Sequence, residues 1–194
     1  DFEPEKGKWS LIGGFLKKVE NLDKAAIRIL HHLTGLNNIY MEQVYTFSKV
    51  DRDPAERTIS VAYYALIDIA THDKELLKQN PIQWFNLKDA PKLIFDHNRM
   101  VEKAMARLRR RALSKPIGFE LLPEKFTMRQ LQKLYEAILD TKLDKRNFIN
   151  KFNSFDILIK LEEKDMSSSK KGAYLFKFDQ EKYNRKVEDG FNFK

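Results

Sequence analysis

Apolar residues recur at helical spacing twice in the first part of the chain. From Leu22 to Leu33 they occupy the i, i+3, i+4, i+7 positions of one buried face, with Asn21 placed to cap the start and Gly35 to end the helix in a left-handed conformation. The same spacing returns from Asp96, which can cap it, to about Leu113, and Lys115-Pro116 stops it. The pattern predicts two amphipathic helices.

Two further helices are expected close together in the second part of the chain. Residues 127–130 have the S/T-x-x-E/Q form of a capping box, and the apolar positions after it predict a helix to Leu139. A short connection leads to a helix capped by Asp144, whose Phe148 and Phe152 point inward.

Short runs rich in β-branched and aromatic residues predict strands in both parts of the chain. These runs are residues 40–47, 58–67, a short stretch near Trp84, 157–162 and 173–178. Strands around the first helix, followed by the second helix, indicate an α+β domain. Helix, helix and then a hairpin with the polar tip EKDMSSSKKG is the order of a winged helix-turn-helix domain. We therefore expect two domains, residues 1–118 and 119–194, joined through a linker at 118–123.

Composition narrows the class of protein. The chain has 194 residues, of which 42% are hydrophobic, enough for real packed cores. It has no cysteine, which excludes disulfides and thiolate metal sites, and no apolar run near the ~18 residues of a membrane span. We expect a cytoplasmic protein without a membrane partner.

Charge is distributed unevenly along the chain. Residues 1–90 carry 12 Lys/Arg and 13 Asp/Glu, whereas residues 91–194 carry 24 and 15, so the whole positive excess lies in the second half. A basic half favours a polyanionic partner such as double-stranded DNA. A solvated basic surface is the alternative, and charge alone does not choose between them.

The stretch from residue 13 to residue 36 holds a set of anchors at fixed offsets. It resembles the Nudix box, G-x5-E-x7-R-E-U-x-E-E-x-G-U, in which U is apolar. The matching residues are Gly14, Glu20, Arg28, Leu30, Gly35 and Leu36. The resemblance implies a Nudix-like α/β/α sandwich, in which Arg28 braces the loop before the helix.

The three box glutamates with which Nudix hydrolases hold magnesium are missing from this chain. Ile29, His32 and Leu33 stand in their places. Isoleucine and leucine offer no oxygen ligand, a histidine nitrogen suits magnesium poorly, and Glu20 alone seldom makes a site. We therefore expect no catalytic residue, no metal, no cofactor and no diphosphate hydrolysis, and we expect Ile29 and Leu33 to pack.

The helix after Asp144 has the polar surface of a DNA-recognition helix. Asparagine suits adenine edges, and lysine and arginine suit guanine edges or phosphates. The hairpin tip adds Lys and Ser donors for phosphates. The predicted DNA contacts are Arg129, Lys145, Arg146, Asn147, Asn150, Lys151, Ser154, Ser168, Lys170 and Lys171. An ordinary solvated helix face is the alternative.

Nearly the whole chain resembles the Nudix-related transcriptional regulators. The matching stretches are KWSLIGGF (8–15), DRDPAERTISVAYYAL (51–66), FDHNRMVEKAMARLRRRA (95–112), FELLPEKFTMRQLQKLYEAILD (119–140) and LDKRNFINKF (143–152). The last two are specific to these regulators. The resemblance implies a homodimer that binds operator DNA and changes its affinity with a small effector.

Some members of this family sense ADP-ribose and control NAD metabolism, and one branch senses L-arabinose and controls pentose use. The stretches 40–44, 60–67 and 169–179 are most similar to the arabinose branch, so we expect a pentose effector, with ADP-ribose as the alternative. Sugars favour aromatic faces with carboxylate or arginine partners. The predicted ligand-binding residues are Trp9, Gly13, Gly14, Glu20, Asp51, Arg52, Tyr63 and Trp84. Core packing is the alternative role of Tyr63 and Trp84.

The resemblance also implies strands ahead of residues 3–9. We expect about 30 further residues before Asp1 in the natural protein, because a Nudix sheet without these strands has an unpaired edge. Two other functions stay open. One is an active Nudix hydrolase with a basic accessory domain, and the other is an interaction protein whose winged helix binds protein.

Overall fold

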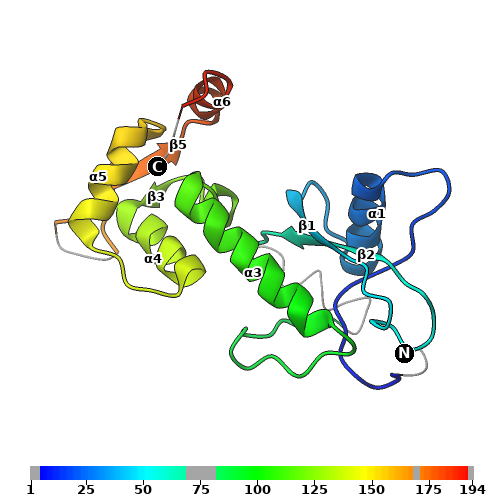
Figure 1. The fold of residues 1–194 in the computed structure, drawn as a ribbon. Helices are drawn as coiled ribbons and strands as arrows, with labels where there is room; N and C mark the ends of the chain where they lie inside the picture. Colours follow the sequence, from blue (N-terminus) through cyan, green and yellow to red (C-terminus); the bar gives the residue numbers. More distant parts are fainter. Residues whose placement is uncertain (1–4, 69–81, 168–170, 192–194) are drawn as a thin grey trace. The chain divides into compact units, whose positions relative to one another are not determined.

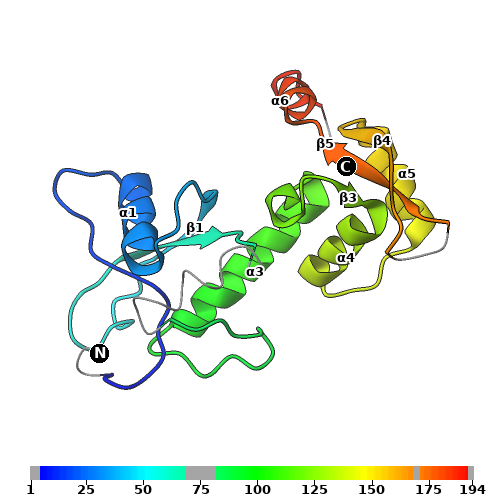
Figure 2. The same cartoon turned by 180° about the vertical axis from the view of Figure 1, so that it is seen from behind.

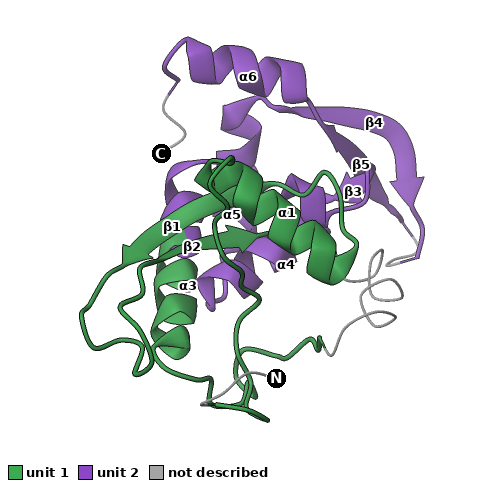
Figure 3. Cartoon of the chain, turned by 90° about the vertical axis from the view of Figure 1, so that its right-hand side faces the viewer, with its two compact units in different colours: residues 1–107 green, residues 108–194 purple. Residues whose placement is uncertain are grey.

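The chain folds into two compact units, residues 1–107 and 108–194, which Figure 3 shows in different colours. The computed structural model describes residues 5–68, 82–167 and 171–191, and no helix within these ranges is long and apolar enough to cross a membrane. The boundary between the units lies inside one helix, α3 (His97–Ser114). The expected division into functional domains at residue 118 stays a prediction, because these units are defined by packing alone.

Helix α1 (Leu22–Thr34) forms where the apolar spacing predicts it. The side chain of Asn21 accepts a hydrogen bond from the backbone N–H of Lys24 at 2.9 Å. Gly35 ends the helix with a φ of 74°, and its N–H donates to the carbonyl of His31 at 2.7 Å. Both ends of the helix are therefore set by the residues that the sequence places there.

Strands β1 (Met41–Phe47) and β2 (Ser60–Ala65) form an antiparallel pair, with an irregularity between residues 43 and 45 of β1. Helix α1 lies beside this pair in both Figure 1 and Figure 2. A hydrogen bond of 2.7 Å from the hydroxyl of Tyr63 to the carboxylate of Asp23 joins β2 to the first turn of α1. The helix and the strand pair are thus linked through side chains as well as by their position.

The strand expected near Trp84 is wrong, since residues 82–86 form no regular structure. The ring of Trp9 packs edge-on against Phe85, with 5.0 Å between ring centroids. The backbone of Trp9 pairs with that of Leu93 in an isolated parallel bridge. The aromatic residues that suggest a strand therefore pack a loop, and their neighbour comes from the N-terminal segment.

A buried ion pair fixes the start of α3. The guanidinium of Arg52, whose side chain is 3% exposed, donates to both carboxylate oxygens of Asp96 at 3.0 and 2.7 Å and to the hydroxyl of Ser60 at 2.7 Å. Beside it, Nδ1 of His97 accepts the backbone N–H of Leu11 at 3.1 Å. Burial lowers the pKa of His97 below its usual 6.5, which favours the neutral ring that this hydrogen bond requires. Four segments of unit 1 meet at this point.

A second ion pair ties α3 to the strand pair. The carboxylate of Glu42 on β1, with its side chain 13% exposed, accepts from the guanidinium of Arg107 at 2.8 Å. The same carboxylate accepts from the hydroxyl of Tyr64 on β2 at 2.9 Å. Arg107 is the last residue of unit 1, so the helix is held by charge-assisted hydrogen bonds up to the point where it enters unit 2.

Unit 2 combines helices with a three-stranded antiparallel sheet in the order β3-β5-β4. Its elements after α3 are the 3-10 turn η1 (Phe119–Leu121), β3 (Phe126–Thr127), α4 (Met128–Leu139), α5 (Lys145–Phe155), β4 (Leu158–Asp165), β5 (Ala173–Phe178) and α6 (Gln180–Glu188). The capping box of Thr127 and Gln130 forms as predicted, with both reciprocal hydrogen bonds. The short strand β3 was not expected, and it exists because Phe126 pairs with Phe176 of β5.

The core of unit 2 is aromatic. Helix α5 buries Phe148, Phe152 and Phe155, and the ring of Tyr135 on α4 packs edge-on against the first two at 5.6 and 5.1 Å. The hydroxyl of Tyr135 accepts the backbone N–H of Ile117 at 2.9 Å, and burial raises the pKa of this hydroxyl. The segment after α3 is thereby fastened to the core, and the winged helix expected from the order of elements is confirmed.

Replacing Asp96 by asparagine should lower the free energy of unfolding by about 3–5 kcal/mol, because the buried guanidinium of Arg52 loses its counter-ion. Urea denaturation followed by circular dichroism measures this difference. The control is Glu124→Gln, which removes the partner of Lys177 at the exposed surface and should have a much smaller effect on the free energy of unfolding. If both variants lower the free energy of unfolding by the same amount, the Arg52–Asp96 pair contributes no more to stability than a surface pair does.

Candidate functional site

The Nudix-box turn is held by one ion pair. The carboxylate of Glu20 accepts from Nε of Arg28 at 2.9 Å and from the backbone N–H of Lys17 at 2.8 Å. Arg28 also donates to the carbonyl of Phe15 at 2.9 Å. These hydrogen bonds, chiefly the one from Arg28, lower the pKa of Glu20 to about 2. Arg28 therefore braces the loop, as expected.

The side chains at the box do not fit magnesium. Ile29 packs against Gly14, where an added Cβ would lie 2.9 Å from Cγ1 of Ile29, so the turn approaches the helix at a glycine. His32 is exposed, Leu33 is half-buried, and the carboxylate of Glu20 is taken up by the ion pair with Arg28. No group of three potential ligands (His, Asp or Glu) is found within residues 5–68, 82–167 and 171–191. The box therefore lacks the oxygen ligands that a magnesium-dependent hydrolase needs.

The first group of predicted ligand-binding residues surrounds α1. Gly13 and Gly14 form the exposed turn before it, and Glu20 lies at the end of the same loop. Tyr63 reaches the first turn of the helix through its hydrogen bond to Asp23. Burial, together with that bond, raises the pKa of Tyr63 to about 12. Gly14, Glu20 and Tyr63 therefore each approach α1, next to Ile29, Arg28 and Asp23 respectively.

The other predicted ligand-binding residues, Trp9, Asp51, Arg52 and Trp84, lie outside the named helices and strands. Trp9 and Trp84 are 38% and 39% exposed, so each indole offers part of its surface to a ligand. Arg52 is 7% exposed and its donors are occupied, so ligand contact would require breaking its buried ion pair. Asp51 is exposed and binds Lys49 at 3.0 Å, and this hydrogen bond lowers the pKa of Asp51. Among the described residues, no hydrogen bond, ion pair or ring contact joins this group to the first.

Sequence reasoning missed the partners of several of these residues. Phe85 supports Trp9, Asp23 receives Tyr63, and Asp96 receives Arg52. The Arg52–Asp96 contact joins residues 44 positions apart, and no local pattern indicates it. The sequence shows that both residues are charged, but it does not show that they pair with each other.

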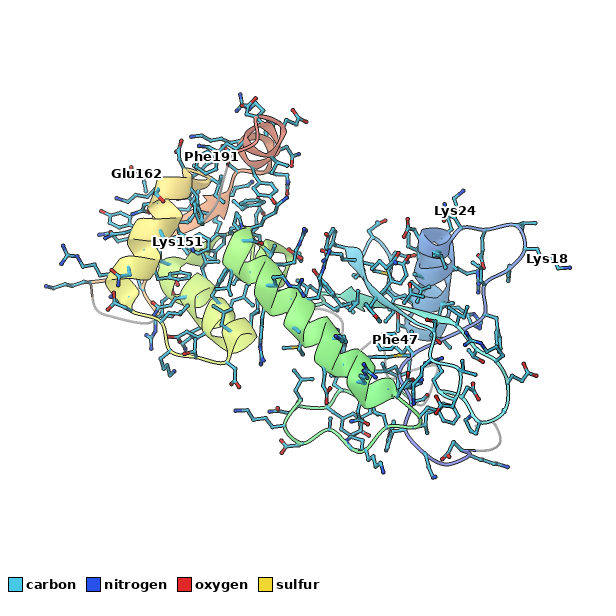
Figure 4. All side chains as sticks on the ribbon, in the orientation of Figure 1. Lys18, Lys24, Phe47, Lys151, Glu162 and Phe191 are labelled. Atoms are coloured by element: carbon cyan, nitrogen blue, oxygen red, sulfur yellow. The ribbon has the colours of Figure 1, made fainter. Side chains whose placement is uncertain are left out.

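The outward face of α5 carries cations and amides. The predicted DNA-contact residues on α4 and α5 are all exposed: Arg129, Lys145, Arg146, Asn147, Asn150, Lys151 and Ser154. Lys151, labelled in Figure 4, stands 5.9 Å from the ring centroid of Phe155, and the hydroxyl of Ser154 donates to the carbonyl of Lys151 at 2.7 Å. Within the described ranges, the basic side chains of α5 have no ion-pair partner.

Other lysines of unit 2 are neutralised by acids. The ion pairs include Lys125 with Glu163, Lys142 with Glu136, Lys177 with Glu124, and Lys182 and Lys186 with Asp156. None of these lysines belongs to α5. A lysine that is already paired must give up its carboxylate before it binds a phosphate, so the cations of α5 are the more available for DNA.

The tip of the β4–β5 hairpin is described in part. Lys171 is exposed there, as a DNA contact requires. Gly172 turns the chain into β5 with a φ of 66°, a conformation that favours glycine. Ser168 and Lys170, both predicted to contact DNA, lie outside the described residues.

A cavity of about 250 Å³ lies in unit 2 between the end of α3, α4 and α5. Its lining is mainly apolar and includes Ala112, Leu113, Tyr135, Leu139, Leu143, Phe148, Phe152 and Phe155. Asn147 and Lys151, two of the predicted DNA contacts, also line it. No sequence pattern indicates this cavity, because its walls come from segments that are separate in the chain.

Comparison with known protein families matches both units of the chain. Residues 2–106 match the NUDIX domain, and residues 118–178 match the NrtR DNA-binding winged helix domain. The ADPR responsive transcriptional repressor NtrR of Acinetobacter baylyi is 33% identical over 187 residues, which cover 93% of this chain and 74% of the relative. The ADP-ribose pyrophosphatase of Methanocaldococcus jannaschii is 30% identical over 103 residues, which cover 53% of this chain and 60% of that enzyme.

A solved structure agrees with these matches. The crystal structure of Shewanella oneidensis NrtR complexed with a 27mer DNA has a TM-score of 0.81 and 27% identity, over 92% of this chain and 83% of that one. Without DNA, the same Shewanella protein gives a TM-score of 0.78 at 28% identity, over 89% of this chain and 80% of that one. The agreement therefore extends over both units.

Replacing Glu20 by glutamine should destabilise unit 1 at neutral pH, because it removes the charge that Arg28 binds. Folding lowers the pKa of Glu20 from 4.5 to about 2, so its contribution is fully present above 4.5 and is lost as the pH falls toward 2. Urea denaturation of both proteins at a series of pH values should show their difference shrinking over this window. Asp51→Asn, at an exposed pair with Lys49, is the control with a smaller effect. A difference that does not change with pH would contradict the role of the Glu20 charge.

Proposed function

Because the chain belongs to the Nudix family and continues into an NrtR-type DNA-binding winged helix domain, we propose that it is a transcriptional regulator whose affinity for operator DNA is controlled by ADP-ribose. The observation that carries the proposal is the exposed face of α5, whose basic side chains have no ion-pair partner among the described residues. In helix-turn-helix geometry this face enters the major groove.

The expected effector changes from a pentose to ADP-ribose. A relative that covers 93% of this chain is an ADPR responsive transcriptional repressor, and a relative that covers 53% of it is an ADP-ribose pyrophosphatase. The similarity to the arabinose branch rests on residues 40–44 and 60–67, which include parts of β1 and β2, and on residues 169–179, of which 173–178 form β5. Most of these residues belong to β-strands, where the choice of residue is governed by strand pairing. Their similarity to the arabinose branch therefore says little about which effector binds.

The chemistry of unit 1 suits a nucleotide sugar without a metal ion. Trp9 and Trp84 are each more than a third exposed and can stack on an adenine ring. Lys18 and Lys24, labelled in Figure 4, are exposed and have no ion-pair partner within the described ranges, so they can meet phosphate charge. Ile29 stands where a hydrolase carries a metal-binding carboxylate, so no negative charge at this position repels the diphosphate.

We propose that this unit binds ADP-ribose without cleaving it. The loss of the box carboxylates and the engagement of Glu20 by Arg28 support this proposal. Incubation with ADP-ribose and magnesium, followed by chromatography for AMP, is the test, and release of AMP would favour the hydrolase alternative. A homodimer and a cytoplasmic location stay predictions.

ADP-ribose should raise the melting temperature of the protein, whereas L-arabinose should not. A ligand that binds only the folded state adds about 2.7 kcal/mol to its stability at 100 times the Kd. A thermal-shift titration with both compounds, and with ribose as a further control, measures this. A rise with L-arabinose alone would restore the pentose expectation.

A pair of variants tests the aromatic contact within the same assay. Trp84→Ala should weaken ADP-ribose binding by about 1–3 kcal/mol through lost stacking. Leu87→Ala, at a 57% exposed position on the same loop, should leave binding unchanged. Equal effects of the two variants would argue against stacking on Trp84.

Arg146→Ala and Asn147→Ala should each weaken operator binding by about 1–3 kcal/mol without changing the affinity for ADP-ribose. The operator is first enriched from a random duplex library, and fluorescence anisotropy then gives the affinity with and without ADP-ribose. The control is Lys182→Ala, which removes a lysine of α6 that is paired with Asp156, and this variant should bind DNA as the wild type does. Normal DNA binding by both α5 variants would overturn the assignment of α5 as the recognition helix.

A further inference from the structure

The edge strand of the wing, β4, carries two lysines that converge on one tyrosine. Nζ of Lys160 lies 3.8 Å from the ring centroid of Tyr174 on β5, and Nζ of Lys164 lies 4.6 Å from it. In the strand register, Lys160 lies opposite Phe176 and Lys164 lies opposite Tyr174. A step of four positions along β4 therefore corresponds to a step of two along β5, because the pairing is irregular between the two lysines. This register places both lysines on the face of the hairpin that carries Tyr174.

The two lysines keep their positive charge uncompensated. Within the described residues neither has an ion-pair partner, and the ring that they share is neutral. The carboxylate of Glu163 on the same strand is bound by Lys125, and that of Asp165 accepts the backbone N–H of Ser167. Two like charges held on one ring repel each other, and an anion placed against them relieves the repulsion.

We propose that Lys160, Lys164 and Tyr174 form a phosphate-contact site through which the wing strand holds the backbone of duplex DNA. The site rests on the proposed function and extends it from the hairpin tip to the strand itself. Helix α5 packs against β4, so the strand that supports the recognition helix also presents the site. Tyr174 is 41% exposed, so its hydroxyl can donate to a phosphate oxygen while its face orients the lysines.

The charges around Lys160 and Lys164 favour a role in binding a polyanion over a purely structural role of these lysines. Lysines on an edge strand can also serve to prevent pairing with another sheet. That role requires no convergence of two lysines on an aromatic ring. Lys125, next to β3, and Lys177, on β5, illustrate the difference, because each binds a glutamate at 2.6 Å. Glu162, labelled in Figure 4, lies between the two lysines of the site on β4, and among the described residues it forms no ion pair with either of them.

The double variant Lys160→Gln, Lys164→Gln tests the site in the intact chain. Fluorescence anisotropy at several salt concentrations should show the slope of log Kd against log salt reduced by about 2, since each lost phosphate contact changes it by about 1. Affinity for the enriched operator and for an unrelated duplex should fall by the same factor, because a phosphate contact carries no sequence information. The matched control Lys125→Gln, Lys177→Gln makes the same change of charge at paired lysines and should keep the wild-type slope.

The outcomes separate this site from the proposed function. A wild-type protein that binds no duplex overturns both. A wild type that binds, with a double variant that keeps its slope, overturns the phosphate site alone. Equal losses in the double variant and its control also overturn the site, because net charge would then explain the effect.

The tyrosine is tested by two substitutions, one that keeps the ring and one that removes it. Tyr174→Phe loses only the neutral hydroxyl, so it should keep the wild-type slope with at most a small loss of affinity. Tyr174→Leu removes the ring and should weaken binding about two- to fivefold through lost orientation of the lysines. Circular dichroism and thermal unfolding establish that both variants fold. Wild-type affinity and slope in Tyr174→Leu would overturn the role of the ring.

Discussion

The bidentate ion pair between Arg52 and Asp96 determines where the connecting helix α3 begins. A guanidinium that is almost wholly buried is tolerated only when its donors are paired, and here they bind a carboxylate and the hydroxyl of Ser60. The next residue, His97, receives the N-terminal segment through its neutral ring. Because Glu42 binds Arg107 ten residues further along α3, the helix is fixed at two points. These two ion pairs therefore hold the elements of unit 1 together alongside its small apolar core.

The Nudix box in this chain keeps the contacts that hold its turn, and three of its glutamate positions carry other residues. Glu20 and Arg28 still close the loop, and Gly14 still approaches the helix. The position of a metal-binding glutamate holds Ile29, which fills the space against that glycine. The replacement of a carboxylate by a packing group removes an oxygen ligand and leaves a turn that is still held in place by its own contacts.

Local patterns predicted the elements whose ends are set locally. Helices α1 and α4 lie where periodicity and capping place them, since Asn21 and Thr127 act on backbone groups within their own first turns. Strand β3 was missed because two residues become a strand only through pairing with β5, about fifty positions away in the chain. For the candidate site, the residue types on α5 were predictable from the sequence, but the lack of ion pairs between them and acids of the described part of the chain was not.

The same limit explains Arg52. A polar loop with arginine and aspartate suggests ligand contact, and the sequence does not reveal that the carboxylate of Asp96 takes up the guanidinium. Trp84 illustrates the converse error, because an aromatic run suggests a strand where the chain forms an exposed loop. Long-range partners decide both cases, and hydrophobic periodicity carries no information about them.

The continuity of α3 bears on how such proteins can evolve. The last turns of this helix belong to unit 2, where Arg109 donates to the carbonyl of Ile138 at 3.1 Å and the segment that follows delivers the N–H of Ile117 to Tyr135. The winged-helix unit therefore begins inside α3, before residue 119. Recombination between regulators at residue 119 would separate it from contacts that complete its own core. An exchange of this unit between regulators would have to include residues 108–118 to keep these contacts.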